Sequence, residues 1–467
     1  TTEIYTLSLH DALPICSCAR PGGGVFVLDR PGQSLQARAL AAGALPPGSY
    51  QHPEVSFDGQ RVLFAYCHAE TTPRDRESNL DRFYHLYEMA ADGTGLRQLT
   101  DGPYDDFSLR YLPNGELLFI STRRGGYHRC GRGPCPTYTL AKAQGDGSNP
   151  HSISYHETHE WDPVVLWDGQ IVYTRWDYVD RHAVYYEQLW STRPDGTGVA
   201  AYYGNYTFNP VGVWEARPVP GSSRVMATAA AHHAMTAGSI ILVDVSKDRD
   251  GLTPITRLTP DALFPESEAP VANRSHPAAW NAWLDGPAPA LPPEAARWPG
   301  HCYRSPYPLS ENYFLTAFSH DPLPGMSSGE GKDTRTGLYY FDRFGNLELL
   351  YNDPQNSCMY PVPLAPRSLP PQIAKNPDAD LGEQGEFLLT DARRSLAPMP
   401  AGRAVRELRI YQLLPKTTTH IVNDPRIGYA NAENARMLLG SVPVERDGSA
   451  FFRAPARKPL YFQVVDD

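Results

Sequence analysis

Residues 161–177, WDPVVLWDGQIVYTRWD, read as two short strands that are joined by a tight turn. The first strand ends before Asp168-Gly169, and the second strand is rich in β-branched and aromatic side chains. Asp-Gly favours a two-residue hairpin because such a turn needs positive φ, which glycine adopts without steric cost. The stretch therefore predicts a β-hairpin.

The same hairpin phrase returns along most of the chain. Its first turns stand about 54 residues apart, at Asp58, Asn114, Asp168 and Gly221. Most of these units contain a second turn, and these turns lie at Asp92-Gly93, Asp146-Gly147, Asp195-Gly196 and Asp250-Gly251. Four strands in a unit of this length predict one blade of a β-propeller.

Two further units are expected to complete the ring. Residues 308–346 give the fifth unit. The sixth unit combines residues 386–390 with two N-terminal strands near residues 25–29 and 35–39, because joining the chain ends removes exposed sheet edges. We therefore predict an all-β fold with a six-bladed propeller, and seven blades is the alternative.

The predicted propeller covers residues 22–404 and contains an insertion near residues 260–300, which are rich in Pro and Ala with little strand pattern. Residues 405–467 carry strand patterns outside the repeat. These patterns predict the start of a small β-sandwich domain that is incomplete within the given sequence.

The first residues need a separate interpretation. Residues 1–16 resemble translated read-through from a sequencing adapter, as found at the ends of metagenomic gene fragments. They lack the basic start and continuous apolar segment of a signal peptide. We therefore expect residues 1–16 to be an artefact outside the fold, and the natural N-terminus, with any export signal, to be missing.

Composition excludes two classes of partner. The 467 residues carry a formal net charge of −10, and they contain no cluster of Lys and Arg, so nucleic acid is not an expected partner. No apolar run approaches the roughly 18 residues that a membrane-spanning helix requires. We therefore expect no membrane span.

Three sequence phrases resemble a known family. They are WDP to YTRWDYVDR over residues 161–181, AHH at residues 231–233 followed by Gly238, and PKTTTH to NDPRIGYAN over residues 415–431. Together these phrases resemble the family named for the middle domain of the hydrazine synthase alpha subunit. The resemblance covers nearly everything from about Gly22 to the end of the chain.

The resemblance implies a TolB-like β-propeller and a protein located outside the cytoplasm, in the periplasm or secreted. Many members of the family continue into a haem segment with the motif Cys-x-x-Cys-His. This sequence contains no such motif, and Cys67-His68 comes nearest with Phe64 at the position of the first cysteine. The resemblance therefore implies haem c in the full-length protein, with a cytochrome or another protein subunit as partner, and no haem site in this sequence.

Residues 151–160, HSISYHETHE, hold the densest group of metal-ligand side chains. His156 and His159 could share a metal with Glu157 or Glu160, since imidazole and carboxylate suit zinc or iron. The spacing differs from His-Glu-x-x-His, and the segment leads into a strand instead of lying on a helix. A polar loop between two blades is the alternative.

His232 and His233 are a second pair of candidate ligands at the end of a predicted strand. Neighbouring residues on a strand point to opposite faces, so this pair alone does not suit one metal ion. One ring projecting into the central channel and one hydrogen-bonded structural histidine are both compatible with the sequence. The candidate metal ligands are thus His156, His159, Glu160, His232 and His233, with the identity of the ion open.

The chain has seven cysteines, and two of them flank a short loop, Cys130-Gly-Arg-Gly-Pro-Cys135. In an oxidising compartment Cys130 and Cys135 could close a disulfide, and in a reducing one they could bind metal. The family resemblance favours the disulfide.

Three functions follow. The leading hypothesis is an extracytoplasmic propeller that serves as scaffold or docking region of a cytochrome-associated protein similar to the hydrazine synthase alpha subunit. The second is a non-catalytic, TolB-like module that binds a protein or an envelope ligand at its channel mouth. The third is a metal-dependent enzyme that uses the region of His156 and His159. No complete catalytic site is apparent in the sequence.

Overall fold

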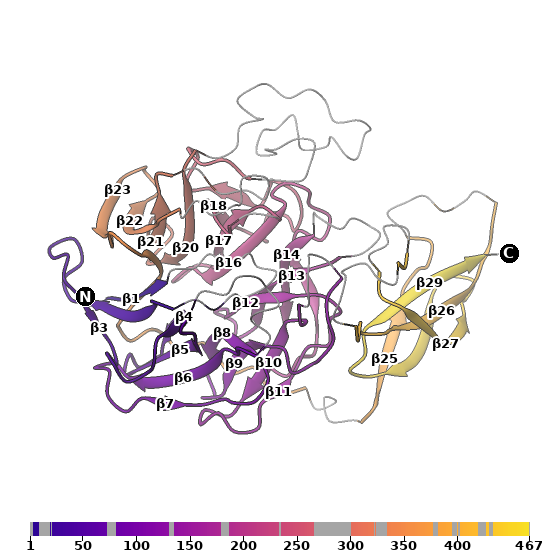
Figure 1. The fold of residues 1–467 in the computed structure, drawn as a ribbon. Helices are drawn as coiled ribbons and strands as arrows, with labels where there is room; N and C mark the ends of the chain where they lie inside the picture. The colour runs from indigo at the N-terminus through magenta and orange to yellow at the C-terminus, as the bar shows by residue number, and fades with distance from the viewer. Residues whose placement is uncertain are drawn as a thin grey trace.

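The structure is a computed structural model whose regular elements, within the described residues, are all β-strands. It describes residues 3–8 (backbone only), 19, 21–71, 81–129, 135–178, 186–232, 235–265, 300–321, 323, 334–376, 382–394, 399, 402–418, 426–428 and 433–466. Figure 1 shows these strands arranged as a ring, with the C-terminal strands at one side of it. The predicted all-β propeller with a small C-terminal unit is the observed architecture.

Two separate four-stranded antiparallel sheets form the first part of the ring. The first sheet contains β4 (Gly48–Val55), β5 (Arg61–His68), β6 (His85–Ala90) and β7 (Arg97–Gln98). The second contains β8 (Asp106–Tyr111), β9 (Leu117–Ser121), β10 (Thr139–Ala143) and β11 (His151–Ser152). Each consists of the two successive hairpins that the repeated Asp-Gly or Asn-Gly turns predict.

Three further four-stranded groups follow. The third group is β12 (Glu160–Val165), β13 (Ile171–Trp176), β14 (Glu187–Thr192) and β15 (Ala200–Tyr203). The fourth is β16 (Gly212–Pro218), β17 (Val225–Ala230), β18 (Gly238–Val243) and β19 (Ile255–Arg257). The fifth is β20 (Cys302–Pro308), β21 (Tyr313–Ser319), β22 (Gly337–Asp342) and β23 (Leu347–Tyr351). Single residue pairs, Glu187 with Gly212 and Gly238 with Tyr303, connect these three groups.

The last sheet of the ring joins the two ends of the propeller sequence. Its order is β24 (Ser357–Pro363), β1 (Glu3–Ser8), β2 (Gly24–Leu28) and β3 (Ala37–Ala39). The predicted N-terminal strands are therefore in place, but their partner is β24 and not residues 386–390. The prediction for residues 386–390 is wrong because β25 (Gln384–Leu389) pairs instead with a strand of the C-terminal unit.

Residues 1–16 were expected to lie outside the fold, yet the backbone of Glu3–Ser8 fills the place between β24 and β2. A strand inserted there satisfies the backbone groups of both neighbours, which would otherwise be sheet edges. The interpretation of residues 1–16 as an artefact concerns the origin of the sequence and stays a prediction.

Six four-stranded groups are thus present among the described residues. The predicted insertion near residues 260–300 falls largely on residues 266–299, which lie outside the described ranges. The described residues contain no helix long and apolar enough to cross a membrane.

The first strand of each group carries the same irregularity. A register shift occurs in the middle of each of these strands, as a β-bulge does. At each shift one residue other than glycine has a positive φ, and these six residues are His52, Ser108, Asp162, Glu215, Ser305 and Tyr360. Such backbone is strained, so it persists only where the surrounding structure enforces it.

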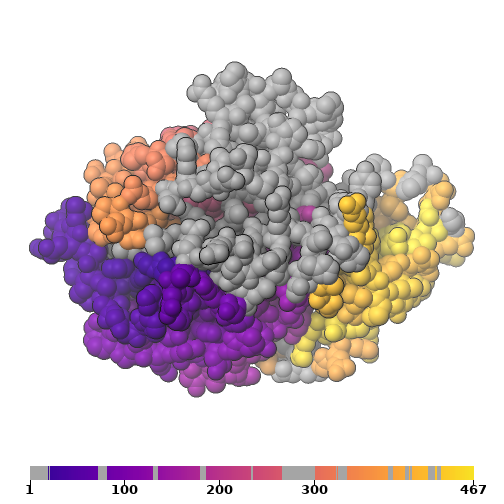
Figure 2. All heavy atoms as spheres, viewed as in Figure 1, coloured from indigo at the N-terminus to yellow at the C-terminus, as the bar shows by residue number. Residues whose placement is uncertain are grey.

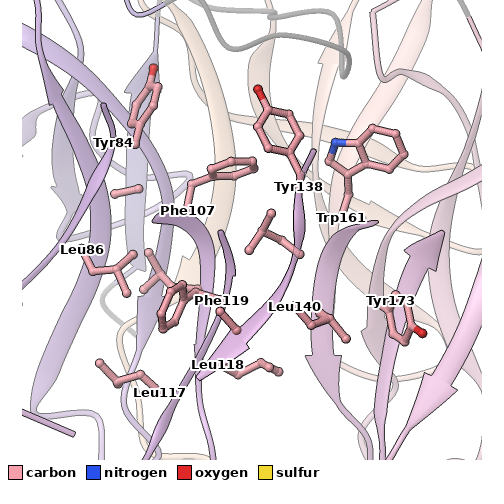
Figure 3. Packing of buried hydrophobic residues seen from close by; sticks show 14 of the residues in the cluster. Tyr84, Leu86, Phe107, Leu117, Leu118, Phe119, Tyr138, Leu140, Trp161 and Tyr173 are labelled. Atoms are coloured by element: carbon pink, nitrogen blue, oxygen red, sulfur yellow. The ribbon is translucent and has the colours of Figure 1, made fainter. Parts of the chain in front are cut away.

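Apolar side chains of neighbouring groups share continuous cores. Figure 3 shows Phe107, Phe119 and Leu140 of the second group packed in one cluster with Trp161 and Tyr173 of the third. Each of these side chains is at least 94% buried, which is the form of packing that holds adjacent sheets of a propeller together.

The C-terminal unit has two small sheets. One pairs β25 with β28 (Ala450–Pro455), and the other has the order β27 (Arg436–Pro443), β26 (Val405–Leu413) and β29 (Leu460–Asp466). Leu408 and Ile410 of one sheet pack against Phe452 and Ala454 of the other. Figure 2 shows the surface of this unit, in yellow, beside that of the propeller.

Residues 364–376 connect the propeller to this unit and run along the turns of three blades. The Arg367 amide donates to the Phe57 carbonyl at 2.9 Å, Gln372 reaches the Pro113 carbonyl, and the Asn376 amide donates to Asp195 at 2.7 Å. We call residues 364–376 the strap. It fixes the turn side of the first three blades.

Candidate metal centre

Three buried side chains meet beside the second and third blades. His128 and Cys135 come from the connection between β9 and β10, and His159 directly precedes β12. Their ligand atoms all lie within 4.8 Å of one another, and Cys135 Sγ is 3.7 Å from His159 Nε2. The two imidazole rings stand 4.6 Å apart between centroids. We call His128, Cys135 and His159 the His-Cys cluster.

Two imidazoles and one thiolate form a donor set that suits zinc, and three protein ligands leave a fourth tetrahedral position open. The separation of Cys135 Sγ and His159 Nε2 is close to that of two ligands on one tetrahedral ion. Residue type, burial and spacing therefore fit a metal ion.

The hydrogen bonding of His159 fits less well. The Tyr138 amide donates to His159 Nδ1 at 3.1 Å, so a neutral ring carries its proton on Nε2, the nitrogen that faces Cys135. Burial, followed by the charge of His128, lowers the pKa of His159 well below its usual range, so the ring is neutral. A metal ligand normally donates from its second nitrogen. Metal binding at Nε2 would therefore require loss of the Tyr138 hydrogen bond or of the ring proton.

His156 lies near the His-Cys cluster but outside it. Its Nε2 donates to the Trp176 carbonyl at 2.9 Å and lies 3.5 Å from Asp177 Oδ1. Burial, followed by the charge of Arg175, lowers the pKa of His156 to about 3. This neutral, bonded ring anchors the loop before β12 to the end of β13.

Glu160 is also engaged elsewhere. Its carboxylate accepts the Leu140 amide at 2.9 Å and the Ser154 hydroxyl at 2.7 Å, and burial raises its pKa. These bonds connect the inner strand of the third blade to the second blade. The structure therefore places Glu160 in a connection between blades.

His232 belongs to a different polar pair. Its Nδ1 lies 2.6 Å from Glu187 Oε1, and both side chains are 99% buried. The ring packs against Trp176 at 5.1 Å between centroids, and Trp176 in turn lies 6.0 Å from the His159 ring. His233 lies outside the described residues.

Of the four predicted ligands that the structure describes, His156, His159, Glu160 and His232, only His159 belongs to the His-Cys cluster. Sequence reasoning missed His128, and it assigned Cys135 to a disulfide with Cys130, which lies outside the described residues. Cys135 is buried, and the predicted Cys130–Cys135 disulfide stays a prediction. One sequence signal could have identified His128. It stands two residues before Cys130, in the same loop as Cys135.

The C-terminal unit contacts the propeller next to the His-Cys cluster. The Tyr127 amide donates to the Lys416 carbonyl at 2.9 Å, and Asn434 Nδ2 lies 3.4 Å from Glu157 Oε2. Burial raises the pKa of Glu157 to about 7, against the opposing hydrogen bond from Asn434. The cluster therefore lies close to the junction of the two units.

The haem that the resemblance implies finds no attachment at Cys67, whose side chain is 99% buried. Burial, followed by the charge of Asp105, raises the pKa of its thiol to about 12. The adjacent His68 is exposed and pairs with Glu70 at 3.6 Å. These residues do not fit a covalently attached haem.

Comparison with known proteins gives one sequence match and several structural ones. Residues 403–467 match the family model of the hydrazine synthase alpha subunit middle domain. No curated protein sequence gives a significant match. The structure is similar to hydrazine synthase from Kuenenia stuttgartiensis, with a TM-score of 0.72 and 16% identity over 100% of this chain and 66% of that chain.

TolB from Acinetobacter baumannii gives a weaker match, with a TM-score of 0.40 and 12% identity over 77% of this chain and 65% of that chain. The chain spans 66% of the length of the hydrazine synthase chain that it matches. It therefore has the fold of hydrazine synthase along its whole length, and it resembles the hydrazine synthase alpha subunit, whose middle-domain family its residues 403–467 match.

Proposed function

We propose that the chain is the propeller scaffold and docking region of an extracytoplasmic, cytochrome-associated redox protein similar to the hydrazine synthase alpha subunit. In this proposal the redox chemistry takes place on haem groups held by other segments or subunits. The fold shared with hydrazine synthase and the family match of residues 403–467 support it. The lack of a haem attachment motif in the sequence agrees with a scaffold role for this part.

One observation carries the docking role. Leu388 on β25 and Phe451 on β28 face each other across the two-stranded sheet, and they are 67% and 62% exposed. Their neighbours Phe387 and Phe452 point to the other face and stack at 5.3 Å in the core of the unit. A cross-strand pair of large apolar side chains on the outer face is suited to burial against a protein partner.

The partner that fits is another protein subunit. The matched family is that of an alpha subunit, which by its name belongs to an enzyme with more than one kind of chain. Phe451 lies within residues 403–467, which match that family, and Leu388 is its cross-strand partner. We therefore assign the outer face of β25 and β28 to a cytochrome or another subunit of the same assembly.

The test is co-purification from cells that mature c-type cytochromes. Full-length tagged protein should purify with haem absorbance and be recovered from the extracytoplasmic fraction. The double variant Leu388→Ser, Phe451→Ser should lose a haem-bearing partner, whereas Leu369→Ser, at a 57% exposed leucine of the strap, should retain it. Full-length protein without haem absorbance, or a double variant that still purifies with the haem-bearing partner, would contradict the proposal.

A second candidate function, metal binding, rests on the His-Cys cluster. Purified protein dialysed against zinc should hold one ion per chain by elemental analysis. His128→Gln and Cys135→Ser should lose it, whereas Cys67→Ser and the exposed His151→Gln should keep it. The same samples should show Cys135 as a free thiol by mass spectrometry. Protein without stoichiometric metal, or with a Cys130–Cys135 disulfide, would exclude this function.

A further inference from the structure

A small cavity lies where the inner strands of the ring come together. Its volume is about 20 Å³, and each of the six first strands contributes at least one lining residue. The residues that line it with polar side chains are His52, Arg110, Asp162, Glu215, Arg217, Ser305 and Tyr360. The cavity is therefore at the axis of the propeller.

The bulges bring these side chains to the axis. His52, Asp162, Glu215, Ser305 and Tyr360 are five of the six residues whose backbone has a positive φ at the bulge of a first strand. Local strain of this kind is unfavourable, so its repetition around one cavity indicates that the arrangement there is enforced by the fold.

The two carboxylates of the cavity already have partners. Asp162 accepts from the Ser108 hydroxyl at 3.1 Å and from the Glu215 amide at 3.2 Å. Glu215 accepts from the Thr228 hydroxyl at 2.8 Å, and from the Ser305 amide at 2.6 Å and hydroxyl at 2.9 Å. These bonds fix the carboxylates to the walls of the cavity.

Two buried atoms of lining residues have no hydrogen-bond partner among the described residues. They are His52 Nδ1 and Arg110 Nε, and both side chains are at least nine-tenths buried. His52 Nε2 lies 3.7 Å from Asp162 Oδ1, and the nearby carboxylate favours the tautomer with the proton on Nε2, in which Nδ1 is an acceptor. Arg110 Nε–H is a donor. The cavity thus presents one unused acceptor and one unused donor.

Size and charge determine what can satisfy both atoms. A cavity needs roughly 10–15 Å³ to hold a water molecule, and a volume of about 20 Å³ leaves no room for a larger ligand. Arg110 and Arg217 both pair with Glu54, and Asp162 and Glu215 have the partners given above, so no unpaired charge is left in the lining to hold an ion. Burial and the charges of Arg110, Arg217 and Arg304 hold the pKa of His52 well below its usual range, which keeps the ring neutral.

We propose that this cavity is a binding site for one structural water molecule, which accepts a hydrogen bond from Arg110 Nε–H and donates one to His52 Nδ1. The water connects β4 with β8 at the axis. A buried polar atom without a partner loses its hydrogen bond to water, so one bridging molecule offsets the desolvation of both groups. The site is independent of the proposed scaffold function.

A crystal structure of the protein at neutral pH and high resolution tests the proposal. We expect one solvent peak within about 3.2 Å of both His52 Nδ1 and Arg110 Nε. His52→Phe should lose the peak, and its ring suits the neighbouring Phe107 and Tyr360. Ser305→Ala should keep the peak, because the Ser305 hydroxyl bonds to Glu215.

Three outcomes would overturn the proposal. They are a cavity without density in the unsubstituted protein, a direct hydrogen bond between His52 and Arg110, and an anomalous peak at the site after a bromide soak, which would assign it to an anion. The unsubstituted protein decides each of these outcomes, so the test stands even if a variant does not fold.

Discussion

Burial sets the charge of several carboxyl groups in the propeller, and two adjacent aspartates show how. Asp106 forms an ion pair with Arg123 at 2.8 Å and accepts the Ser121 hydroxyl at 2.7 Å. Asp105 is 92% buried and accepts the Tyr84 amide at 3.0 Å. Burial raises the pKa of Asp105 to about 7, the Tyr84 bond opposes this, and the charge of Asp106 adds to it.

We expect this aspartate to make stability depend on pH. Its pKa is higher in the folded state than its usual value of about 3.8, so folding favours the protonated form. The stability that Asp105 contributes is fully present below about pH 4 and is lost as the pH rises through about 7. Its magnitude is up to about 4 kcal/mol. Asp105→Asn should therefore flatten the stability profile between pH 4 and pH 8.

Chemical denaturation at a series of pH values measures this effect. Asp391→Asn is a control at a half-buried aspartate whose pKa is lowered by its hydrogen bonds to Arg393, and it should leave the slope above pH 5 unchanged. An unaltered slope in Asp105→Asn would show that Asp105 is ionised throughout this range.

At the scale of elements, the turn glycines have two separable roles. Gly169 and Gly115 occupy equivalent hairpin turns with φ of 85° and 84°. A Cβ at Gly115 would meet no atom within 4 Å, whereas a Cβ at Gly169 would press on the Pro371 carbonyl of the strap and lie 3.0 Å from Ile373 Cγ1. Gly115 is therefore needed only for the turn, whereas Gly169 also leaves room for the strap to approach.

Alanine at the two positions should therefore have different effects. Gly115→Ala should cost about 1–2 kcal/mol from the left-handed backbone alone. Gly169→Ala should cost more, by at least about 1 kcal/mol, because the strap must also move away. Equilibrium unfolding of the two variants measures the difference, and equal losses would mean that the strap contributes no close contact at this turn.

For the whole molecule, one carboxylate joins parts of the chain that are far apart in sequence. Glu54 on β4 is fully buried and lies 2.9 Å from Arg217 of β16, 3.6 Å from Arg110 of β8, and in contact with Arg367 of the strap. Burial alone would raise its pKa, but the three guanidinium groups outweigh burial and lower the pKa to about 2. Glu54 thus connects β4 with β8, with β16 and with the strap.

Removal of this charge should destabilise the fold strongly. Glu54→Gln leaves three buried guanidinium groups without their shared anion, and breaking a buried ion pair costs about 3–5 kcal/mol. Glu386→Gln removes an exposed partner of Arg453 and should cost at most about 1 kcal/mol. A comparable loss of unfolding free energy in the two variants would contradict a central role for Glu54.

Only part of the candidate metal site could be predicted from the sequence. His159 was predicted from the concentration of ligand-type residues around it. Its companions were not, because His128 lies 31 positions earlier and meets it only when the second and third blades pack. Proximity in sequence also suggested His156 and Glu160, which the structure engages with Trp176 and Leu140 instead.

The sequence by itself determined the hairpins, their repetition and the separate C-terminal unit. Asp-Gly turns and alternating apolar residues act over a few positions, so their pattern is legible without the fold. Only the tertiary structure decided that β24 closes the ring, that residues 384–389 belong to the C-terminal unit, and that His128, Cys135 and His159 meet. These features depend on contacts between segments that are far apart in sequence. The energies of such contacts cannot be derived from a pattern of a few neighbouring residues.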